Sequence, residues 1–249
     1  MKAWANIKMH WSKFLIALLA IILVGSYAFT GKRVQDDSKI ISYVADPEKQ
    51  NIRFYWKDDG AKIFRSISGL KGWLESKNET LVFAMNGGMY KPDNSPQGLY
   101  VQDQVTLATL DTGSGKGNFY LKPNGVFCIT TTKQACICKT ADYPAIKDVN
   151  FATQSGPLLV INGEINPAFK KGSSNLNVRN GVGILPGNKI LFAMSKEPVN
   201  FFDFATYFKS KGCKDALYLD GFVSRTYLPE KGWKQTDGDF GVIVGVTAP

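Results

Sequence analysis

The stretch ALYLDGFVSR, residues 216–225, contains an apolar run typical of a buried strand that ends abruptly in Asp-Gly. Three further stretches combine an apolar run with glycine turns: LVFAMNGGMY (81–90), TQSGPLLVING (153–163) and VRNGVGIL (178–185). Such a junction places a polar side chain at the rim of a sheet, where a ligand can approach the backbone closely. One junction is an ordinary turn, but four in one domain indicate loops that converge on a single site.

Hydrophobic spacing around these stretches predicts short strands and two helices. Apolar residues recur at helical spacing over residues 63–76 and 201–211, which indicates two amphipathic helices. Residues 40–45 and 52–56 are interpreted as strands that pair with each other across a short turn. The glycine-rich run 113–117 lacks the Gly-Lys-Ser/Thr ending of a phosphate-binding loop, so it is interpreted as a flexible hairpin.

The first 28 residues have the features of a secretory signal peptide. Three lysines precede the apolar run 14–24, and the small residues of a cleavage site follow it. Because this run is shorter than the roughly 20 residues of a membrane-spanning helix, a cleaved signal is favoured over an uncleaved membrane anchor. We therefore expect a signal peptide over 1–28, a linker over 29–39 and the functional domain over 40–249, exported to the periplasm, cell envelope or extracellular space.

Net charge and histidine content narrow the chemistry. The 249-residue chain has a formal charge of +9, which becomes +6 (9 − 3) without the three lysines of the signal. This excess suits anionic polymers or an anionic cell surface, but the basic residues are scattered, so nucleic-acid binding is not expected. The single histidine, His10, lies in the signal, so a mature chain has no histidine-based triad or metal site. Catalysis must then depend on carboxylates, Lys, Arg, Tyr, backbone amides or an oxygen-ligated metal.

Four cysteines would meet an oxidising compartment after export: Cys128, Cys136, Cys138 and Cys213. An even count in that setting favours one or two disulfides. Cys128 lies on a predicted strand next to the one that carries Cys136 and Cys138, which favours a cross-strand bridge. A zinc site and a catalytic thiol are both disfavoured, because the spacing is Cys-x-Cys and no histidine is available.

Asp220 is the first candidate for a reacting group. It follows the apolar run Ala-Leu-Tyr-Leu and precedes a glycine, so its carboxylate should lie at a strand end and could act as acid, base, nucleophile or cation ligand. The alternative is an aspartate that caps an ordinary Asp-Gly turn. Glu164, which follows Asn162-Gly163, is the second candidate carboxylate, and a solvated hairpin tip explains it equally well.

Two arginines could supply positive charge. Arg179 and Asn180 lie inside an apolar stretch, where an arginine must pair or enter a cleft, and its planar fork suits phosphate or carboxylate. A structural ion pair is the alternative. Arg225 could provide a second cation or neutralise Asp220.

Glycine turns could supply backbone contacts. The amides of Asn86-Gly87-Gly88 could hold an anion or a sugar hydroxyl, although Asn-Gly alone predicts a hairpin turn. Ser155-Gly156-Pro157 is likewise either a tight turn or a hydroxyl-plus-amide contact. Asn86 and Asp220 each follow a predicted helix and strand, and this faint repetition would bring them to equivalent strand ends; chance similarity explains it at least as well.

In order and spacing, these motifs resemble the phosphodiester glycosidase family. The matching motifs are Asn86-Gly87-Gly88-Met89-Tyr90, Pro96-Gln97-Gly98-Leu99, Asn118-Phe119-Tyr120, Pro123-Asn124-Gly125-Val126-Phe127, Gln154-Ser155-Gly156-Pro157-Leu158-Leu159, Arg179-Asn180-Gly181-Val182-Gly183 and Tyr218-Leu219-Asp220-Gly221. No single motif is specific, but the ordered set is. The last family motif often reads Asp-Gly-Gly-Gly-Ser-Ser, whereas this chain has Phe222 and Val223 inside it, which should narrow that loop and alter the substrate.

The resemblance implies an α+β fold, a single domain with a mixed, largely antiparallel sheet, short flanking helices and converging glycine-rich loops. It also implies hydrolysis of a glycosyl–phosphate bond, with Asp220, Arg179 and Glu164 as the catalytic candidates. Substrate contacts are then expected from Asn86, Gly87, Gly88, Gln154, Ser155, Gly156, Asn180, Gly181, Gly221, Ser224 and Arg225.

The mechanism that this resemblance implies needs no histidine, because phosphodiester leaving groups require little protonation. Arg179 and backbone amides would hold the phosphate, and Asp220 would stabilise the oxocarbenium-like sugar, activate water or hold a divalent cation. No cofactor is firmly implied, so a divalent cation stays an option.

The expected partner is an envelope glycan or another sugar phosphodiester, with the membrane involved only through an uncleaved N-terminal segment. The alternative is a non-catalytic envelope glycan-binding module of the same fold. The presence of Asn86, Ser155, Arg179 and Asp220 together favours an enzyme. The oligomeric state is left open.

Overall fold

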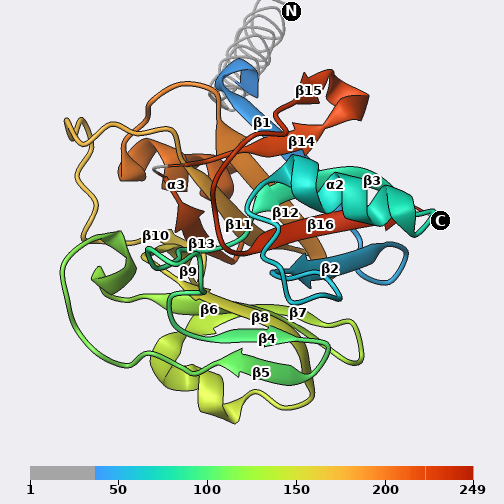
Figure 1. Cartoon of the computed structure of the whole chain (residues 1–249). Coiled ribbons are helices and arrows are strands. Elements are labelled where there is room, and N and C mark those ends of the chain that lie inside the picture. Colours follow the sequence, from blue (N-terminus) through green and yellow to red (C-terminus); the bar gives the residue numbers. More distant parts are fainter. Residues whose placement is uncertain (1–36, 222, 249) are drawn as a thin grey trace, which may run out of the picture. The chain divides into compact units, whose positions relative to one another are not determined.

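The computed structural model describes residues 37–221 and 223–248. In this part of the chain it contains three sheets, two α-helices and four short 3-10 helices (Figure 1). The expected signal peptide and most of the expected linker lie outside the described residues. The last linker residues, Asp37–Lys39, form the 3-10 helix η1, and the first strand begins directly after it.

Each sheet is assembled from strands that are distant in sequence. Sheet 1 has the order β1 (Ile40–Ala45), β12 (Lys189–Ser195), β11 (Asn180–Leu185), β13 (Asp215–Asp220), β9 (Leu158–Ile161), β10 (Glu164–Ile165). Sheet 2 has the order β15 (Trp233–Lys234), β14 (Thr226–Leu228), β3 (Thr80–Asn86), β16 (Ile243–Ala248), β2 (Asn51–Tyr55). Sheet 3 has the order β5 (Val105–Ala108), β4 (Tyr100–Gln102), β8 (Val149–Ser155), β6 (Gly125–Thr130), β7 (Ala135–Lys139).

The α+β class expected from the family resemblance is confirmed, with three sheets in place of one. Every pairing between these strands is antiparallel, so the described residues contain no parallel component of the expected mixed sheet. The remaining 3-10 helices are η2 (Asn118–Tyr120), η3 (Thr140–Ala145) and η4 (Pro229–Lys231). No helix in the described part of the chain is long and apolar enough to cross a membrane.

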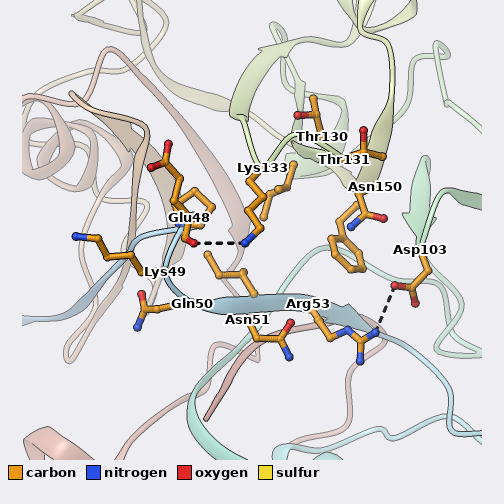
Figure 2. A pocket seen from close by; sticks show the side chains of 14 residues that line it. Glu48, Lys49, Gln50, Asn51, Arg53, Asp103, Thr130, Thr131, Lys133 and Asn150 are labelled. Carbon is orange, nitrogen blue, oxygen red and sulfur yellow. Dashed lines mark hydrogen bonds and ion pairs between the residues drawn. The ribbon is translucent and has the colours of Figure 1, made fainter. Parts of the chain in front are cut away.

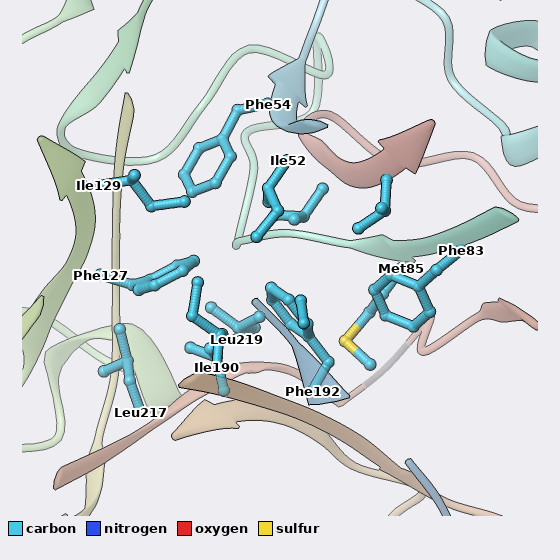
Figure 3. Close-up of a cluster of buried hydrophobic side chains, with 14 of the residues drawn as sticks. Ile52, Phe54, Phe83, Met85, Phe127, Ile129, Ile190, Phe192, Leu217 and Leu219 are labelled. Atoms are coloured by element: carbon cyan, nitrogen blue, oxygen red, sulfur yellow. The ribbon is translucent and has the colours of Figure 1, made fainter. Parts of the chain in front are cut away.

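The main hydrophobic core lies between the three sheets. Figure 3 shows Phe192 of sheet 1, Phe54 of sheet 2 and Phe127 of sheet 3 in one cluster of buried side chains. The ring centroids of Phe54 and Phe127 are 5.5 Å apart, and those of Phe127 and Phe192 are 6.0 Å apart. These spacings lie in the range of favourable aromatic pairs, so the cluster ties the sheets together.

The two α-helices cover outer faces of sheets 1 and 2. Alternate residues of β12 point to opposite faces: Phe192 enters the main core, whereas Leu191 packs in the cluster formed with helix α3 (Phe201–Ser210). Helix α2 (Ile67–Ser76) packs in the same way with β3 and β16 (Figure 1). Burial on both faces explains why these strands read as continuous apolar runs.

The predicted helix over 63–76 begins later than its apolar spacing suggested. Ser66 is the N-cap, and its hydroxyl accepts a hydrogen bond from the Gly69 N–H at 3.1 Å. Arg65, just before it, has φ = 61°, which an α-helix cannot contain. The second predicted helix starts as expected at Phe201, where Asn200 caps it by accepting from the Asp203 N–H at 2.8 Å.

Two local predictions were wrong. Strands β1 and β2 do not pair with each other, because the chain between them crosses over the main core; β1 pairs with β12 and β2 pairs with β16. The run 113–117 forms no hairpin and instead belongs to a loop between β5 and η2.

The expected cross-strand bridge is present. Cys128 of β6 and Cys136 of β7 are direct partners in the strand register, and they form a disulfide with 5.2 Å between their Cα atoms. Cys138 and Cys213 are free thiols. Burial raises the pKa of the Cys138 thiol to about 11 and that of Cys213 to about 12, so both stay protonated near neutral pH.

Candidate functional site

Asp220 lies where strands of sheets 1 and 2 meet. It is the last residue of β13, and its register partner is Asn180, the first residue of the neighbouring strand β11. Asn86, the last residue of β3 in sheet 2, approaches the same point. All three side chains are buried, and 7% of Asp220 remains exposed. The prediction that strand ends converge here is therefore correct in its geometry.

A network of hydrogen bonds fixes the Asp220 side chain. The Gly221 N–H donates to Asp220 Oδ1 at 2.6 Å, and Asn86 Nδ2 donates to Asp220 Oδ2 at 3.4 Å. Asn180 Oδ1 accepts from the Asp220 N–H at 2.7 Å, while Asn180 Nδ2 donates to Asn86 Oδ1 at 2.8 Å. Asn86 Oδ1 also accepts from the Arg225 N–H at 2.9 Å. The two asparagine amides thus orient the carboxylate and the loop that follows it.

The carboxylate of Asp220 borders a pocket of about 570 Å³, which we call the Asp220 pocket. The other lining residues are Met89, Tyr90, Lys91, Pro92, Gln97 and Val223. Among the residues that the structure describes, Asp220 is the only carboxylate in that lining. Burial, and then the negative charges of Asp220 and Asp239, raise the pKa of the Tyr90 hydroxyl to about 12, so it stays a hydrogen-bond donor near neutral pH.

Arg179 does not face this pocket as the sequence interpretation required. Its side chain is fully buried, with the guanidinium carbon 3.6 Å from the centroid of the Phe201 ring. Nε donates to the Val199 carbonyl at 2.8 Å and Nη2 to the Asn175 carbonyl at 2.9 Å, while Nη1 lies 3.4 Å from the Tyr218 hydroxyl. Burial lowers the pKa of this guanidinium. None of the ion pairs of the described residues joins Arg179 to a carboxylate. Carbonyl oxygens and aromatic rings therefore stabilise the positive charge of Arg179.

Tyr218 connects Arg179 to the Asp220 loop. A Cβ added to Gly221 would overlap the Tyr218 hydroxyl, so only glycine fits directly after Asp220. Burial raises the pKa of the Tyr218 hydroxyl, while the positive charge of Arg179 opposes that rise. Arg179, Tyr218 and Gly221 thus form a packed series that ends beside the carboxylate.

The Gln154-Ser155-Gly156 motif is structural in its contacts. Gln154 Nε2 donates to the Asp111 carbonyl at 2.6 Å, and its Oε1 accepts from the Leu99 and Asp111 N–H groups at 3.0 and 2.9 Å. Ser155 Oγ donates to the Leu219 carbonyl at 2.8 Å. Gly156 allows the chain to pass close to Asn124. These groups shape loops around the site, and none of them lines the Asp220 pocket.

The remaining predicted glycines also serve close packing. A Cβ on Gly88 would lie 2.5 Å from Thr153 Oγ1, and one on Gly181 would lie 2.8 Å from the Leu217 carbonyl. Gly87 is equally tight against Val244. Contacts this short require glycine.

The other predicted charged residues are engaged elsewhere. Glu164 is exposed on β10 and pairs with Lys209 at 2.6 Å. It lies near Asp215, the first residue of β13, whereas Asp220 is the last, so about 16 Å of strand separates the two ends. Arg225 pairs with Asp237 at 2.9 Å and does not neutralise Asp220. Ser224 Oγ donates to the Asp220 carbonyl at 3.1 Å.

The described residues around Asp220 provide few free oxygen ligands for a divalent cation. Among residues 37–221 and 223–248, no three His, Cys, Asp or Glu side chains lie close enough to hold a metal ion. The nearby amide oxygens of Asn86 and Asn180 already accept hydrogen bonds from protein N–H groups. Calcium takes about six to eight oxygen ligands, whereas magnesium keeps several waters and needs only one or two carboxylates together with substrate phosphates. The residues around Asp220 therefore form no dedicated protein cage for a cation, and we derive no step through one.

Comparison with known proteins decides the family. Residues 79–242, about two thirds of the chain, match the family model described as phosphodiester glycosidase. The chain is also 34% identical over 188 residues to the uncharacterized protein YigE of Escherichia coli (strain K12), which covers 75% of this chain and 73% of that protein. The chain belongs to the phosphodiester glycosidase family.

Solved structures share the phosphodiester glycosidase fold described above. The catalytic domain of zebrafish N-acetylglucosamine-1-phosphodiester alpha-N-acetylglucosaminidase, auto-inhibited by its pro-peptide, superposes with a TM-score of 0.59 at 12% identity, covering 85% of this chain and 84% of that one. A putative exported protein from Burkholderia pseudomallei K96243 gives 0.54 at 10% identity, covering 83% and 73%. At such low identities these matches establish the fold alone.

For a phosphodiester glycosidase, the sequence interpretation missed most of the pocket wall. Met89, Tyr90, Lys91 and Gln97 line the Asp220 pocket, although Met89, Tyr90 and Gln97 belong to motifs that carried the resemblance. For Met89, Tyr90 and Lys91, the position directly after Asn86-Gly87-Gly88 is a signal that the sequence offers.

A separate pocket of about 380 Å³ lies far from these motifs, between the turn after β1 and the β6–β7 turn (Figure 2). In it Lys133 donates to the Glu48 carbonyl at 3.3 Å, and Arg53 pairs with Asp103 at 3.7 Å. None of the predicted site residues lines this pocket. Because it contains none of the motif residues, we assign no role to it in the family chemistry.

Proposed function

We propose that this protein is an exported hydrolase that cleaves the sugar–phosphate ester of a glycosyl phosphodiester in an envelope or extracellular glycan. The observation that carries the proposal is the Asp220 carboxylate, oriented by Gly221 and Asn86 and bordering the Asp220 pocket. Family membership supports the reaction class. The disulfide between Cys128 and Cys136 supports export, because such bonds persist in oxidising compartments.

In the proposed reaction the bond between sugar C1 and the phosphate oxygen breaks. Positive charge develops at C1, and the fixed carboxylate of Asp220 stabilises it electrostatically. Water supplies the new C1 hydroxyl, and the departing group leaves as a phosphate monoester. Because that group is a weak base, its departure needs little proton donation, and the Tyr90 hydroxyl can donate a hydrogen bond to a substrate oxygen.

A single-carboxylate mechanism fits the pocket better than a carboxylate pair. Glycosidases with two catalytic carboxyl groups hold them about 5–9.5 Å apart. Glu164 lies at the opposite end of β13 and is paired with Lys209, so it cannot take the second role in this arrangement.

The test is hydrolysis of an aryl phosphodiester of α-N-acetylglucosamine by the full chain. We expect Asp220→Asn, which keeps the shape of the side chain, to lower kcat by at least about a hundredfold. Asp148→Asn is the matched control, because Asp148 is exposed near β8 and, at φ = 53°, has a backbone conformation that asparagine tolerates well.

Equal rates for wild type and Asp220→Asn would refute the role of this carboxylate. No turnover by a well-folded wild type, together with binding of the same phosphodiester, would instead identify a glycan-binding module. A chelator added to the wild-type assay tests for a cation, because an unchanged rate fits the mechanism without one and a lost rate would place a cation beside Asp220.

A further inference from the structure

Lys91 stands at the boundary of two pockets. It lines the Asp220 pocket and also a second pocket of about 350 Å³, which we call the Thr109 pocket. The other residues lining the Thr109 pocket are Pro96, Gly98, Ala108, Thr109, Leu110, Asp111, Thr112 and Gly113. Gln97 lines the Asp220 pocket, and its chain neighbours Pro96 and Gly98 line the Thr109 pocket, so the two pockets are adjacent and Lys91 belongs to both linings. We call the two pockets together the groove.

The backbone at Lys91 is held firmly. The Lys91 N–H donates to the Ser95 carbonyl at 2.9 Å, and the Asn94 N–H donates back to the Lys91 carbonyl at 2.8 Å. Outside this turn, Gln97 N–H donates to the Met89 carbonyl at 2.9 Å, and Trp56 Nε1 donates to the Asn94 carbonyl at 3.0 Å. Because the backbone is already fixed, binding of an anion by Lys91 costs side-chain entropy but little backbone entropy.

The charge of Lys91 is available for a ligand. None of the ion pairs in the described residues includes Lys91. The neighbouring Asp93 carboxylate accepts from the Ser95 hydroxyl at 2.6 Å and the Ser95 N–H at 3.0 Å, and these bonds, with a smaller contribution from the Lys91 charge, lower the pKa of Asp93. Arg179 is buried and Arg225 pairs with Asp237. Among residues 37–221 and 223–248, Lys91 is thus the only cationic side chain that lines the Asp220 pocket.

We propose that Lys91 binds the phosphate of the substrate, with the sugar in the Asp220 pocket and the group esterified on the other side of the phosphate in the Thr109 pocket. This inference rests on the proposed function. A phosphodiester has its anionic group between two substituents, and the groove has its cation between two pockets. The order of charges and cavities therefore matches the order of groups in the substrate.

The Thr109 pocket favours a hydroxylated group over a lipid chain. Thr109, Asp111 and Thr112 bring hydroxyl and carboxylate oxygens to its wall. Gln154 holds the Asp111 backbone through both of its amide atoms, and Tyr120 donates to Asp111 Oδ2 at 2.9 Å. Such a polar, preorganised wall hydrogen-bonds to a sugar or polyol, whereas an alkyl chain would leave its polar groups unpaired. The structure thus selects polyol- or sugar-linked phosphodiesters as substrates.

Binding is measured first, in the Asp220→Asn background of the full chain, so that turnover does not complicate the titration. The calorimetric probes are α-N-acetylglucosamine 1-phosphate esterified with glycerol and the same sugar phosphate esterified with decanol. We expect the glycerol ester to bind more tightly, and Lys91→Ala to weaken it about tenfold or more. Lys91→Arg should retain most of the affinity. Lys189→Ala, a change at an exposed lysine at the start of β12, should leave it unaltered.

Hydrolysis of the glycerol ester in the Asp220 wild-type background then separates the two proposals. We expect Lys91→Ala to raise KM and to change kcat much less, because the lysine contacts phosphate in both substrate and transition state. Three results would overturn the inference. They are unchanged affinity in Lys91→Ala, tighter binding of the decyl ester than of the glycerol ester, and binding of neither ester by the Asp220→Asn protein that retains Lys91. Lysine-dependent binding without hydrolysis by the wild type would refute the proposed hydrolysis and leave Lys91 as the phosphate contact of a binding module.

Discussion

Replacing Arg179 tests whether the buried guanidinium supports the fold or contacts the ligand. In the structure it stacks on Phe201 and donates to the carbonyls of Val199 and Asn175, two residues of separate loops. Arg179→Met keeps most of the side-chain volume and removes the charge and all donors. We therefore expect a loss of stability with little direct effect on phosphate binding.

The magnitude follows from the bonds that have no substitute. The Val199 carbonyl also accepts from the Asn177 N–H at 3.2 Å, and Asn175 is exposed enough to bind water, so part of the loss is offset. Counting about two charge-assisted bonds at roughly 1.5–3 kcal/mol each gives about 3–6 kcal/mol. Relief of the cost of burying the cation returns some of this. We expect a net loss of about 2–4 kcal/mol, or roughly 4–16 °C in Tm for a domain of this size.

The assay is urea unfolding followed by tryptophan fluorescence, combined with KM for the glycerol phosphodiester. Arg53→Met is the matched control, because Arg53 forms an exposed pair with Asp103 at 3.7 Å that should contribute less than about 1 kcal/mol. A midpoint for Arg179→Met equal to that of the control, accompanied by a large rise in KM, would show that Arg179 reaches the phosphate. That result would restore the interpretation made from the sequence.

Two other predictions concern packing and the disulfide. Gly221→Ala should lower stability by about 1–3 kcal/mol and abolish hydrolysis, because its Cβ would overlap the Tyr218 hydroxyl. Tyr218→Phe in the same chain should recover part of the stability and part of the hydrolysis. Strictly additive losses in the double-mutant cycle would contradict the overlap. Replacing Cys128 and Cys136 by serine should reduce the free energy of unfolding by about 2–3 kcal/mol, as expected for a sequence separation of 8. Reductant should lower the unfolding midpoint of Cys138→Ser as much as it lowers that of the wild type. If reductant had no effect on Cys138→Ser, the disulfide would involve Cys138, which would contradict the pairing described here.

Local elements were predictable from this sequence, and their pairing was not. The spacing of apolar residues identified both helices, and the Asn200 cap fixes the start of the second at Phe201. Strands β1 and β2 were also recognised, yet each pairs with a strand more than 100 residues away in the chain. Nothing local distinguishes a hairpin from a crossover, because the choice depends on which sheets share the core.

Arg179 illustrates the same limit at the site. Its apolar surroundings correctly indicated an unusual environment, and the two solutions considered were an ion pair or a cleft. The structure uses a third, in which the carbonyls of two loops and the rings of Phe201 and Tyr218 hold the cation. That solution depends on residues brought together only by folding, so residue type and spacing could not reveal it.

The most recognisable residues of the site act on the position of Asp220 and not on the ligand. Ser155 bonds to the carbonyl of Leu219, and Asn180 bonds to the N–H of Asp220 itself. A buried polar side chain whose only hydrogen-bond partner is the ligand would have unpaired donors or acceptors in the ligand-free protein, which proteins avoid. The principal donors and acceptors of these side chains bond within the protein.

Some motif residues thus fix the position of the carboxylate, whereas the pocket that it borders has a mixed lining. Met89, Tyr90, Gln97 and Asp220 belong to the motifs that carried the family resemblance, and Lys91, Pro92 and Val223 do not. Substitutions at Lys91 and Val223 should therefore change which phosphodiester is accepted and leave the unfolding free energy nearly unchanged. Substitutions at Asn180 or Ser155 should do the reverse, because they remove bonds that the fold itself requires.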